Sequence, residues 1–158
     1  MVHLKRNNMT IISGGQTGID RLGLETAREC GLPTGGYAPK DYRTENGPDP
    51  SLKEFGLIET VSSSYTPRTI ANIRASDGTV LFGDTTSRGS ADTIEYCIKY
   101  GRPYIENPTA EKLLQFIREH NIRVLNVAGN RASRLTRTQL TYYRAVLLST
   151  FRQLYRHQ

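Results

Sequence analysis

The sequence predicts a three-layer α/β fold with a mainly parallel sheet and a long C-terminal helix. Short β-branched or apolar runs alternate with segments of helical periodicity along the chain. Such alternation is typical of parallel strands joined by helices that cover both faces of the sheet. The strand-like runs lie at 10–13, 36–38, 58–61, 78–82, 102–105 and 123–127. The helical segments lie at 19–30, 67–76, 91–100 and 109–120.

Glycine and proline mark where these elements begin and end. Gly31 and Pro33 end the first helix, because glycine suits a helix C-cap and proline cannot continue a helix. Pro67 suits the first turn of a helix. Segment 39–50 has no periodicity and is rich in Pro, Gly, Asn and Asp, which predicts a long surface loop. A loop of this length is either functional or a tolerated insertion.

A helix of about 20 residues is predicted to close the chain. Its apolar stripe recurs every three or four residues and consists of Leu140, Tyr143, Leu147, Phe151 and Leu154. A stripe of this kind faces either the core or a second copy of the chain, and we favour the core.

Composition indicates one globular domain over residues 1–158, with 37% hydrophobic and 23% charged residues. No apolar run approaches the roughly 20 residues of a membrane span, and residues 1–8 lack the features of a secretory signal. We therefore expect a cytoplasmic protein without a membrane partner. Cys30 and Cys97 fit buried core positions, and the three histidines show no metal-binding spacing, so no metal site is expected.

The positive charge is concentrated near the C-terminus. The net charge is +6, and arginines but no acidic residues follow Glu119. These arginines fit a solvated helix face, a site for a small anion, or a nucleic-acid contact. Nucleic acid is the least favoured of the three, because the arginines are spaced out and no recognisable DNA- or RNA-binding module is present.

A glycine-rich loop joins the first strand to the first helix, where free N–H groups and the helix dipole favour phosphate. Its candidate ligand-binding residues are Gly14, Gly15, Gln16, Thr17, Gly18, Asp20 and Arg21. The loop lacks the Lys and Ser/Thr of a P-loop and does not match the dinucleotide fingerprint. A tight turn without a ligand is the alternative.

Two further polar loops leave strand ends that a parallel sheet places at the same edge, so the three loops should converge. They and nearby segments supply further candidate ligand-binding residues: Lys40, Arg68, Asn72, Arg88, Gly89, Ser90, Thr93, Asn126, Gly129, Arg131 and Ser133. Ordinary turn and helix-cap chemistry is the alternative for these residues.

Several motifs, in this order, resemble a known family: Ser-Gly-Gly-Gln-Thr-Gly-Ile-Asp-Arg at 13–21, Gly-Gly-Tyr-Ala-Pro-Lys at 35–40, Glu-Asn-Gly-Pro at 45–48 and Asn-Val-Ala-Gly at 126–129. They resemble the "putative molybdenum carrier" family, in the circularly permuted branch of the SLOG superfamily of nucleotide-binding proteins. The resemblance implies a Rossmann-like fold, a homodimer or higher homo-oligomer, and a phosphate-bearing ligand.

We therefore expect a carrier, sensor or sequestering protein for a nucleotide or an ADP-ribose-type signal. One alternative is a nucleotide N-glycosidase, since superfamily relatives use a Gly-Gly-x-Gly-Thr-x-x-Glu motif. Here Glu95 comes one residue early and Tyr96 holds the glutamate position, and one residue turns a helical side chain by about 100°. No catalytic residue is therefore assigned, although Asp20 or Asp92 would be substitutes. The other alternative is carriage of molybdate or the molybdenum cofactor.

Overall fold

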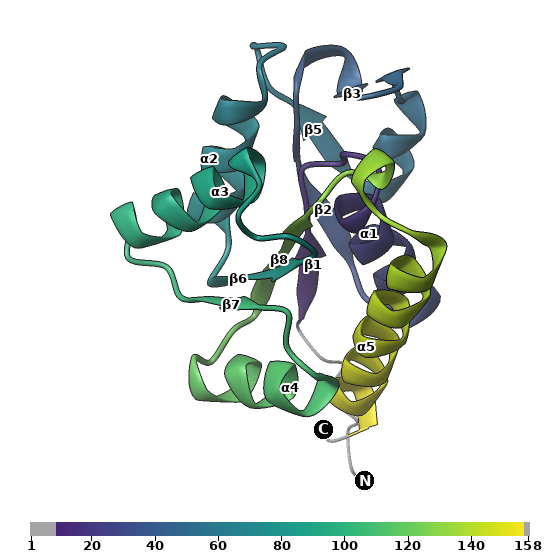
Figure 1. Ribbon diagram of the computed structural model, residues 1–158, viewed down its shortest axis with the longest axis vertical. Helices are drawn as coiled ribbons and strands as arrows, with labels where there is room; N and C mark the ends of the chain where they lie inside the picture. Colours follow the sequence, from purple (N-terminus) through teal and green to yellow (C-terminus); the bar gives the residue numbers. More distant parts are fainter. Residues whose placement is uncertain (1–8, 157–158) are drawn as a thin grey trace, which may run out of the picture.

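Six parallel strands form the central sheet of the computed structural model, which describes residues 9–156 (Figure 1). The strand order is β5-β2-β1-β8-β6-β7, and every neighbouring pair is parallel. The last strand of the sequence thus lies at the centre of the sheet, between β1 and β6. The strands are β1 (Thr10–Ile12), β2 (Thr34–Ala38), β5 (Leu57–Glu59), β6 (Gly78–Phe82), β7 (Tyr104–Glu106) and β8 (Val124–Gly129).

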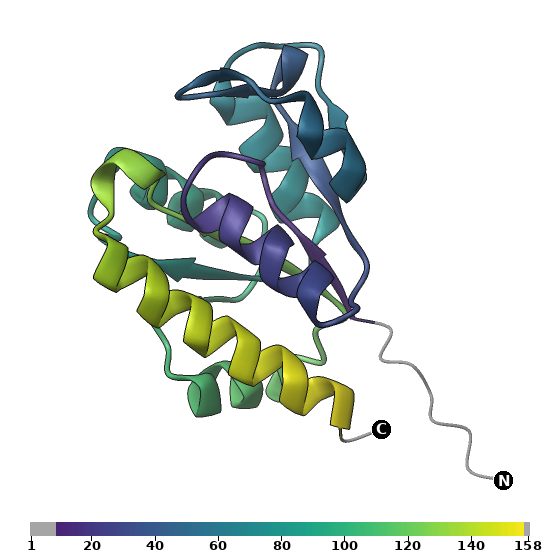
Figure 2. The ribbon, with the colours of Figure 1, turned by 90° about the vertical axis from the view of Figure 1, so that its right-hand side faces the viewer.

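Five α-helices cover the two faces of this sheet: α1 (Ile19–Glu29), α2 (Tyr65–Ala75), α3 (Arg88–Lys99), α4 (Ala110–Glu119) and α5 (Arg137–Arg156). Helices α1, α4 and α5 pack together on one face, and α2 and α3 pack on the other (Figures 1 and 2). This arrangement confirms the predicted three-layer α/β fold with a long C-terminal helix.

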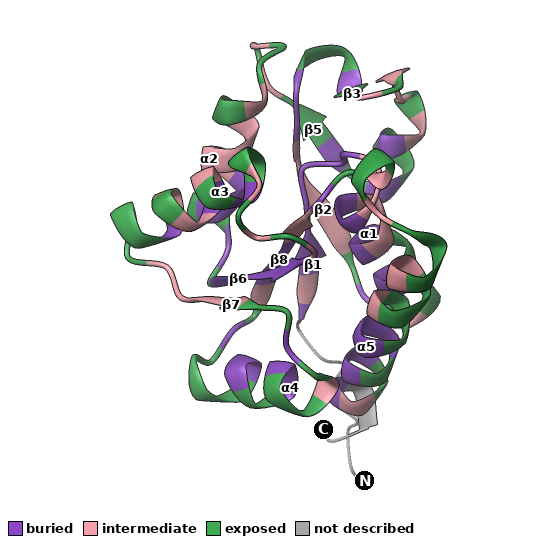
Figure 3. Ribbon diagram, in the orientation of Figure 1, coloured by how far each residue is buried: buried purple, intermediate pink, exposed green. Residues whose placement is uncertain are grey.

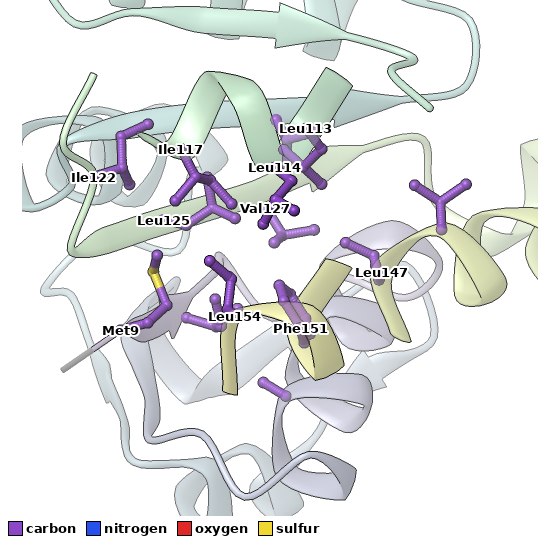
Figure 4. Close-up of a cluster of buried hydrophobic side chains, with 14 of the residues drawn as sticks. Met9, Leu113, Leu114, Ile117, Ile122, Leu125, Val127, Leu147, Phe151 and Leu154 are labelled. Atoms are coloured by element: carbon purple, nitrogen blue, oxygen red, sulfur yellow. The ribbon is translucent and has the colours of Figure 1, made fainter. Parts of the chain in front are cut away.

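The main hydrophobic core lies between the sheet and the face formed by α1, α4 and α5. Leu147 and Phe151 of α5 are fully buried and lie near Leu113 of α4 and Val127 of β8 (Figure 4). The stripe on α5 therefore faces the core, as favoured from its spacing. Figure 3 shows the same layering, with buried residues along the central strands and exposed residues on the outer helical surfaces.

The predicted surface loop at 39–50 is more ordered than the sequence indicated. It contains the 3-10 helix η1 (Lys40–Tyr42) and an antiparallel pair formed by β3 (Arg43–Thr44) and β4 (Gly47–Pro48). The 3-10 helix η2 (Pro50–Phe55) follows. Tyr42, Leu52 and Phe55 are buried in a second hydrophobic cluster with Leu24 of α1. We call residues 40–55 the flap. The prediction of an irregular loop is wrong here because these apolar anchors attach the segment to the body of the protein.

Two helices begin earlier than the sequence predicted. Helix α2 starts at Tyr65 instead of Pro67, and α3 starts at Arg88 instead of Ala91. Arg88 and Gly89 therefore belong to the first turn of α3 and not to the loop before it. Among residues 9–156, no helix combines the length and apolarity that crossing a membrane would require, and this holds for α5 as well.

Candidate functional site

A cavity of about 410 Å³ lies at the carboxyl end of β8, between the first turns of α2 and α3. Gln16 and Asp20 of the β1–α1 connection also reach it. It is lined by Gln16, Asp20, Tyr65, Thr66, Arg68, Thr69, Ser87, Arg88, Gly89, Ser90, Asp92, Thr93, Tyr96, Ala128, Gly129, Asn130, Arg131 and Arg134. The predicted convergence of three loops therefore holds, since each contributes to one wall of the cavity.

Positive charge dominates the lining. Arg88, Arg131 and Arg134 are exposed at its rim, and half-buried Arg68 reaches it from α2. Only two carboxylates, Asp20 and Asp92, belong to the lining, which gives four cationic groups against two anionic groups. Guanidinium groups bind phosphate and carboxylate through two parallel hydrogen bonds, so this cavity suits an anion.

The start of α3 offers free backbone donors to the cavity. Its N-cap residue, Ser87, makes no side-chain capping hydrogen bond. Within the described part of the chain, no hydrogen bond uses the N–H of Arg88, Gly89 or Ser90, and the first helical bond runs from the N–H of Ala91 to Ser87 at 2.8 Å. These free donors and the positive end of the helix dipole make the start of α3 suited to an anion.

The glycine loop before α1 is closely packed by other parts of the protein. A side chain at Gly14 would lie 2.7 Å from Nε of Arg68, and one at Gly18 would lie 2.4 Å from the carbonyl oxygen of Asn130. The N–H of Ile19 already donates to that same oxygen at 3.1 Å. The glycines therefore allow chain segments to approach each other. Gln16 and Asp20 are the residues of this loop that line the cavity. The binding of a phosphate at this loop stays a prediction.

Two predicted ligand-binding residues, Thr17 and Ser133, hold Glu45 of the flap. The hydroxyl of Thr17 donates to Oε2 of Glu45, and Ser133 donates through its hydroxyl (2.5 Å) and its N–H (3.1 Å). Burial alone would raise the pKa of Glu45, but the hydrogen bonds from Ser133 and Thr17 lower it below its ordinary value. Neither Thr17 nor Ser133 lines the cavity, and both connect the flap to the site loops.

Asp20 brings a carboxyl group to the cavity wall, and the residue is buried, with only 5% of its surface exposed. Its Oδ2 accepts a hydrogen bond from the N–H of Gln16 at 3.2 Å. Burial raises the pKa of Asp20 to about 6, although the positive charge of Arg68 and the backbone donors of Gln16 and Gly14 act in the opposite direction. A carboxyl group that titrates near neutral pH in a cavity is a candidate functional group.

The remaining predicted residues lie outside the lining. Arg21 pairs with Asp49 at 2.9 Å, Lys40 is exposed, and Gly15 packs against Leu52 of the flap. Asn72 makes two hydrogen bonds to the backbone of Tyr37, and Asn126 donates to Thr79 at 3.2 Å. These contacts give the two asparagines structural roles.

Several lining residues were not predicted. Tyr65 and Thr66 come with the earlier start of α2, and Ser87 comes with the earlier start of α3, whereas Thr69 lies within the predicted helix, one turn after Tyr65. Arg134 follows from its position one turn after Arg131, in the basic C-terminal segment. The cap-like Ser64 and Ser87 before each helix were the available sequence signal for these starts.

A second, more open hollow of about 650 Å³ follows the outer side of α5. It is lined by α5 residues alone, including Arg144, which pairs with Glu29 at 2.5 Å. No strand end, glycine loop or predicted site residue contributes to this hollow, so we place the candidate site at the smaller cavity. Across the described residues, no cluster of three His, Cys, Asp or Glu side chains could hold a metal ion.

Comparison with known proteins gives one family and one solved structure. The model of the circularly permutated YpsA SLOG family matches residues 11–149, a span that includes every residue of the cavity lining. The crystal structure of a "putative molybdenum carrier protein" from Syntrophus aciditrophicus SB is 33% identical, with a TM-score of 0.79. That match covers 92% of this chain and 96% of the other chain. No curated protein sequence matches significantly.

Proposed function

The chain belongs to the circularly permuted YpsA SLOG family, and from this premise we propose that its cavity binds a phosphate-bearing nucleotide or nucleotide-derived small molecule. The protein would act as a carrier, sensor or sequestering protein for that ligand, as a homodimer or higher homo-oligomer. The observation that carries the proposal is the open start of α3. Its free N–H groups at Arg88, Gly89 and Ser90 face a cavity with an arginine-rich rim.

The remainder of the cavity suits the non-phosphate part of such a ligand. Its volume of about 410 Å³ falls within the range of small-molecule sites, roughly 300–1,000 Å³. Tyr65 and Tyr96 line it. The guanidinium groups of Arg43 and Arg68 lie over the ring of Tyr65 at 4.9 and 5.2 Å, so the ring of Tyr96 offers the flat surface on which a base can stack. Ser90 and Thr93 are buried in the lining and bring hydroxyl groups close to the ligand.

A molybdenum-containing cargo is the second candidate, favoured by the name of the related protein from Syntrophus aciditrophicus SB. Molybdate is an oxyanion, and the molybdenum cofactor carries a phosphate, so the same N–H groups and arginines would serve either one. Hydrolysis of the superfamily type is less favoured. Glu95 is exposed and does not belong to the lining, whereas Tyr96 at the expected glutamate position does.

The test is native mass spectrometry of the purified protein, followed by calorimetric titration with AMP, ADP-ribose, phosphate and molybdate. We expect a phosphate-bearing compound to bind in the micromolar range, and Arg131→Ala to weaken it by about tenfold through loss of a charge-assisted contact. Arg144→Ala is the matched control, since it removes an arginine that lies on α5. If no oxyanion binds the wild-type protein, the proposal is wrong. The same spectra give the oligomeric state.

A further inference from the structure

Asp20 is an unusual group for a cavity that binds anions. It is buried in the lining, and no Lys, Arg or His nitrogen of the described residues lies within 4.0 Å of its carboxylate oxygens. A carboxylate offers about four acceptor positions, and the N–H groups of Gln16 and Gly14 are its backbone donors. A buried carboxylate without an ion pair is energetically unfavourable, so a ligand donor for its remaining positions has a physical rationale.

Arg68, in contrast, has hydrogen-bond donors without acceptors. Its guanidinium group lies against Gly14, its Nη1 donates to the hydroxyl of Thr69, and its Nε is buried without a hydrogen-bond partner. No hydrogen bond of the described residues uses Nη2. The positive charge of Arg68 acts on Asp20 although the two groups form no ion pair. An acceptor and a donor thus face one cavity without being joined.

We propose that Asp20 and Arg68 together bind a hydroxyl group of the phosphorylated ligand, which selects sugar phosphates and nucleotides over bare oxyanions. A hydroxyl group both donates and accepts, so it can donate to the Asp20 carboxylate and accept from the Arg68 guanidinium. Phosphate or molybdate presents mainly acceptor oxygens, which the Asp20 carboxylate repels. The inference rests on the proposed function and specifies the class of ligand within it.

The surrounding charges make this selection depend on pH. Arg68 faces Asp20 from α2, Arg88 and Asp92 belong to α3, and Arg131 and Arg134 follow β8. Because burial raises the pKa of Asp20 to about 6, the carboxylate is ionised at pH 8 and largely protonated at pH 5. A protonated carboxyl donates to an oxyanion, so the discrimination should be strong at pH 8 and weak at pH 5.

The experiment is a calorimetric cycle at pH 8 with AMP, 2′-deoxy-AMP, 3′-deoxy-AMP and inorganic phosphate. We expect one deoxy compound to bind the wild-type protein about tenfold more weakly than AMP. Asp20→Asn should weaken the binding of AMP by a similar factor, leave the affinity for that deoxy compound nearly unchanged and strengthen the binding of phosphate. Arg68→Lys keeps the charge but loses the guanidinium geometry, and it should also reduce the preference for AMP.

Glu95→Gln is the matched control, because it removes one negative charge from α3 outside the cavity lining. Circular dichroism establishes that each variant is folded before titration. The inference is overturned if Asp20→Asn changes the affinities for AMP and both deoxy compounds by the same factor. It is also overturned if the preference for AMP over phosphate is equal at pH 5 and pH 8. If nothing in the panel binds the wild-type protein, the proposed function itself fails, and this outcome is distinct from the other two.

Discussion

Helices α4 and α5 begin differently from helix α3, and the difference coincides with the cavity. At α4, the side chain of Thr109 accepts a hydrogen bond from the N–H of Lys112 at 3.2 Å. At α5, Thr136 and Gln139 exchange side-chain and backbone bonds in a reciprocal cap. Ser87 before α3 makes no such bond. The starts of α4 and α5, outside the cavity, are therefore capped by side chains, whereas the start of α3 at the cavity is open, as is that of α2, whose N-cap residue Ser64 makes no side-chain capping bond.

Residue type does not explain the open start, because serine is among the preferred N-cap residues. The hydroxyl of Ser87 instead accepts a hydrogen bond from Nδ2 of Asn130 at 3.1 Å. Asn130 also bonds the backbone N–H of Asp84 at 2.6 Å and its carbonyl at 3.0 Å. The residue after β8 thus organises the loop before α3 and engages the natural cap. The N–H groups of the first turn remain available to a ligand.

A carboxylate placed at the open start should have the largest effect on binding. Gly89→Asp introduces a negative charge where a Cβ meets no atom within 4 Å, so the fold should tolerate it. We expect ligand affinity to fall by about a hundredfold, while the free energy of unfolding rises by about 1 kcal/mol from the favourable helix-dipole interaction. Calorimetric titration and thermal unfolding measure the two quantities.

Gly89→Ala separates size from charge in this experiment. It should raise stability by about 0.5 kcal/mol and weaken binding by far less than the aspartate does. If alanine and aspartate weaken binding equally, the start of α3 acts through its shape, and its role as an anion-binding surface is excluded.

The second largest effect should be the pH dependence of stability that Asp20 contributes. Its pKa is about 6 in the folded protein and 3.8 in the unfolded chain, so the folded protein binds more protons between these values. The contribution of Asp20 to stability is therefore full below about pH 4 and is lost as pH rises through about 6, by up to about 3 kcal/mol. Urea unfolding of the wild-type protein and of Asp20→Asn from pH 4 to pH 8 gives the free energy of unfolding of each, and the difference between them isolates the contribution of Asp20.

Glu45 changes the pH dependence of stability in the opposite direction. The contribution of Asp20 is therefore read from the difference between the wild-type protein and Asp20→Asn, in which the contribution of Glu45 cancels. Its lowered pKa gives a contribution that is present above the ordinary pKa of glutamate and is lost as pH falls. A stability difference that does not change between pH 4 and pH 8 would show that Asp20 does not titrate in this range.

The difference between local patterns and long-range contacts explains which parts of the fold the sequence could predict. Strand and helix periodicity is local, so the six strands and the long final helix were found within a few residues of their observed ends. The flap was not, because its order depends on Tyr42 and Leu52 packing against Leu24, far along the chain. Nothing in the composition of 39–50 reveals that contact.

The predicted site residues also divide into those with a local sequence signal and those whose role depends on distant partners. Arg88, Ser90 and Thr93 are predicted as site residues because a helix start after a buried strand is a local signal, and all three line the cavity. Thr17 and Ser133 have equally suitable side chains, but both bind Glu45, which is 28 and 88 residues away in sequence. Which polar groups remain free for a ligand depends on such long-range partners, and a single sequence does not reveal them.

The smallest effect should come from removing the two cap residues, and it tests the comparison of helix starts directly. Thr109→Ala removes an observed capping bond and should lower the free energy of unfolding by about 1 kcal/mol without changing ligand affinity. Ser87→Ala removes no capping bond but loses the hydrogen bond from Nδ2 of Asn130, so it should lower the free energy of unfolding by about 0.5 kcal/mol, less than Thr109→Ala. Urea unfolding of the two variants side by side measures both changes. A clearly larger loss for Ser87→Ala than for Thr109→Ala would mean that Ser87 also caps α3 in solution, and the open start on which the binding proposal depends would not exist.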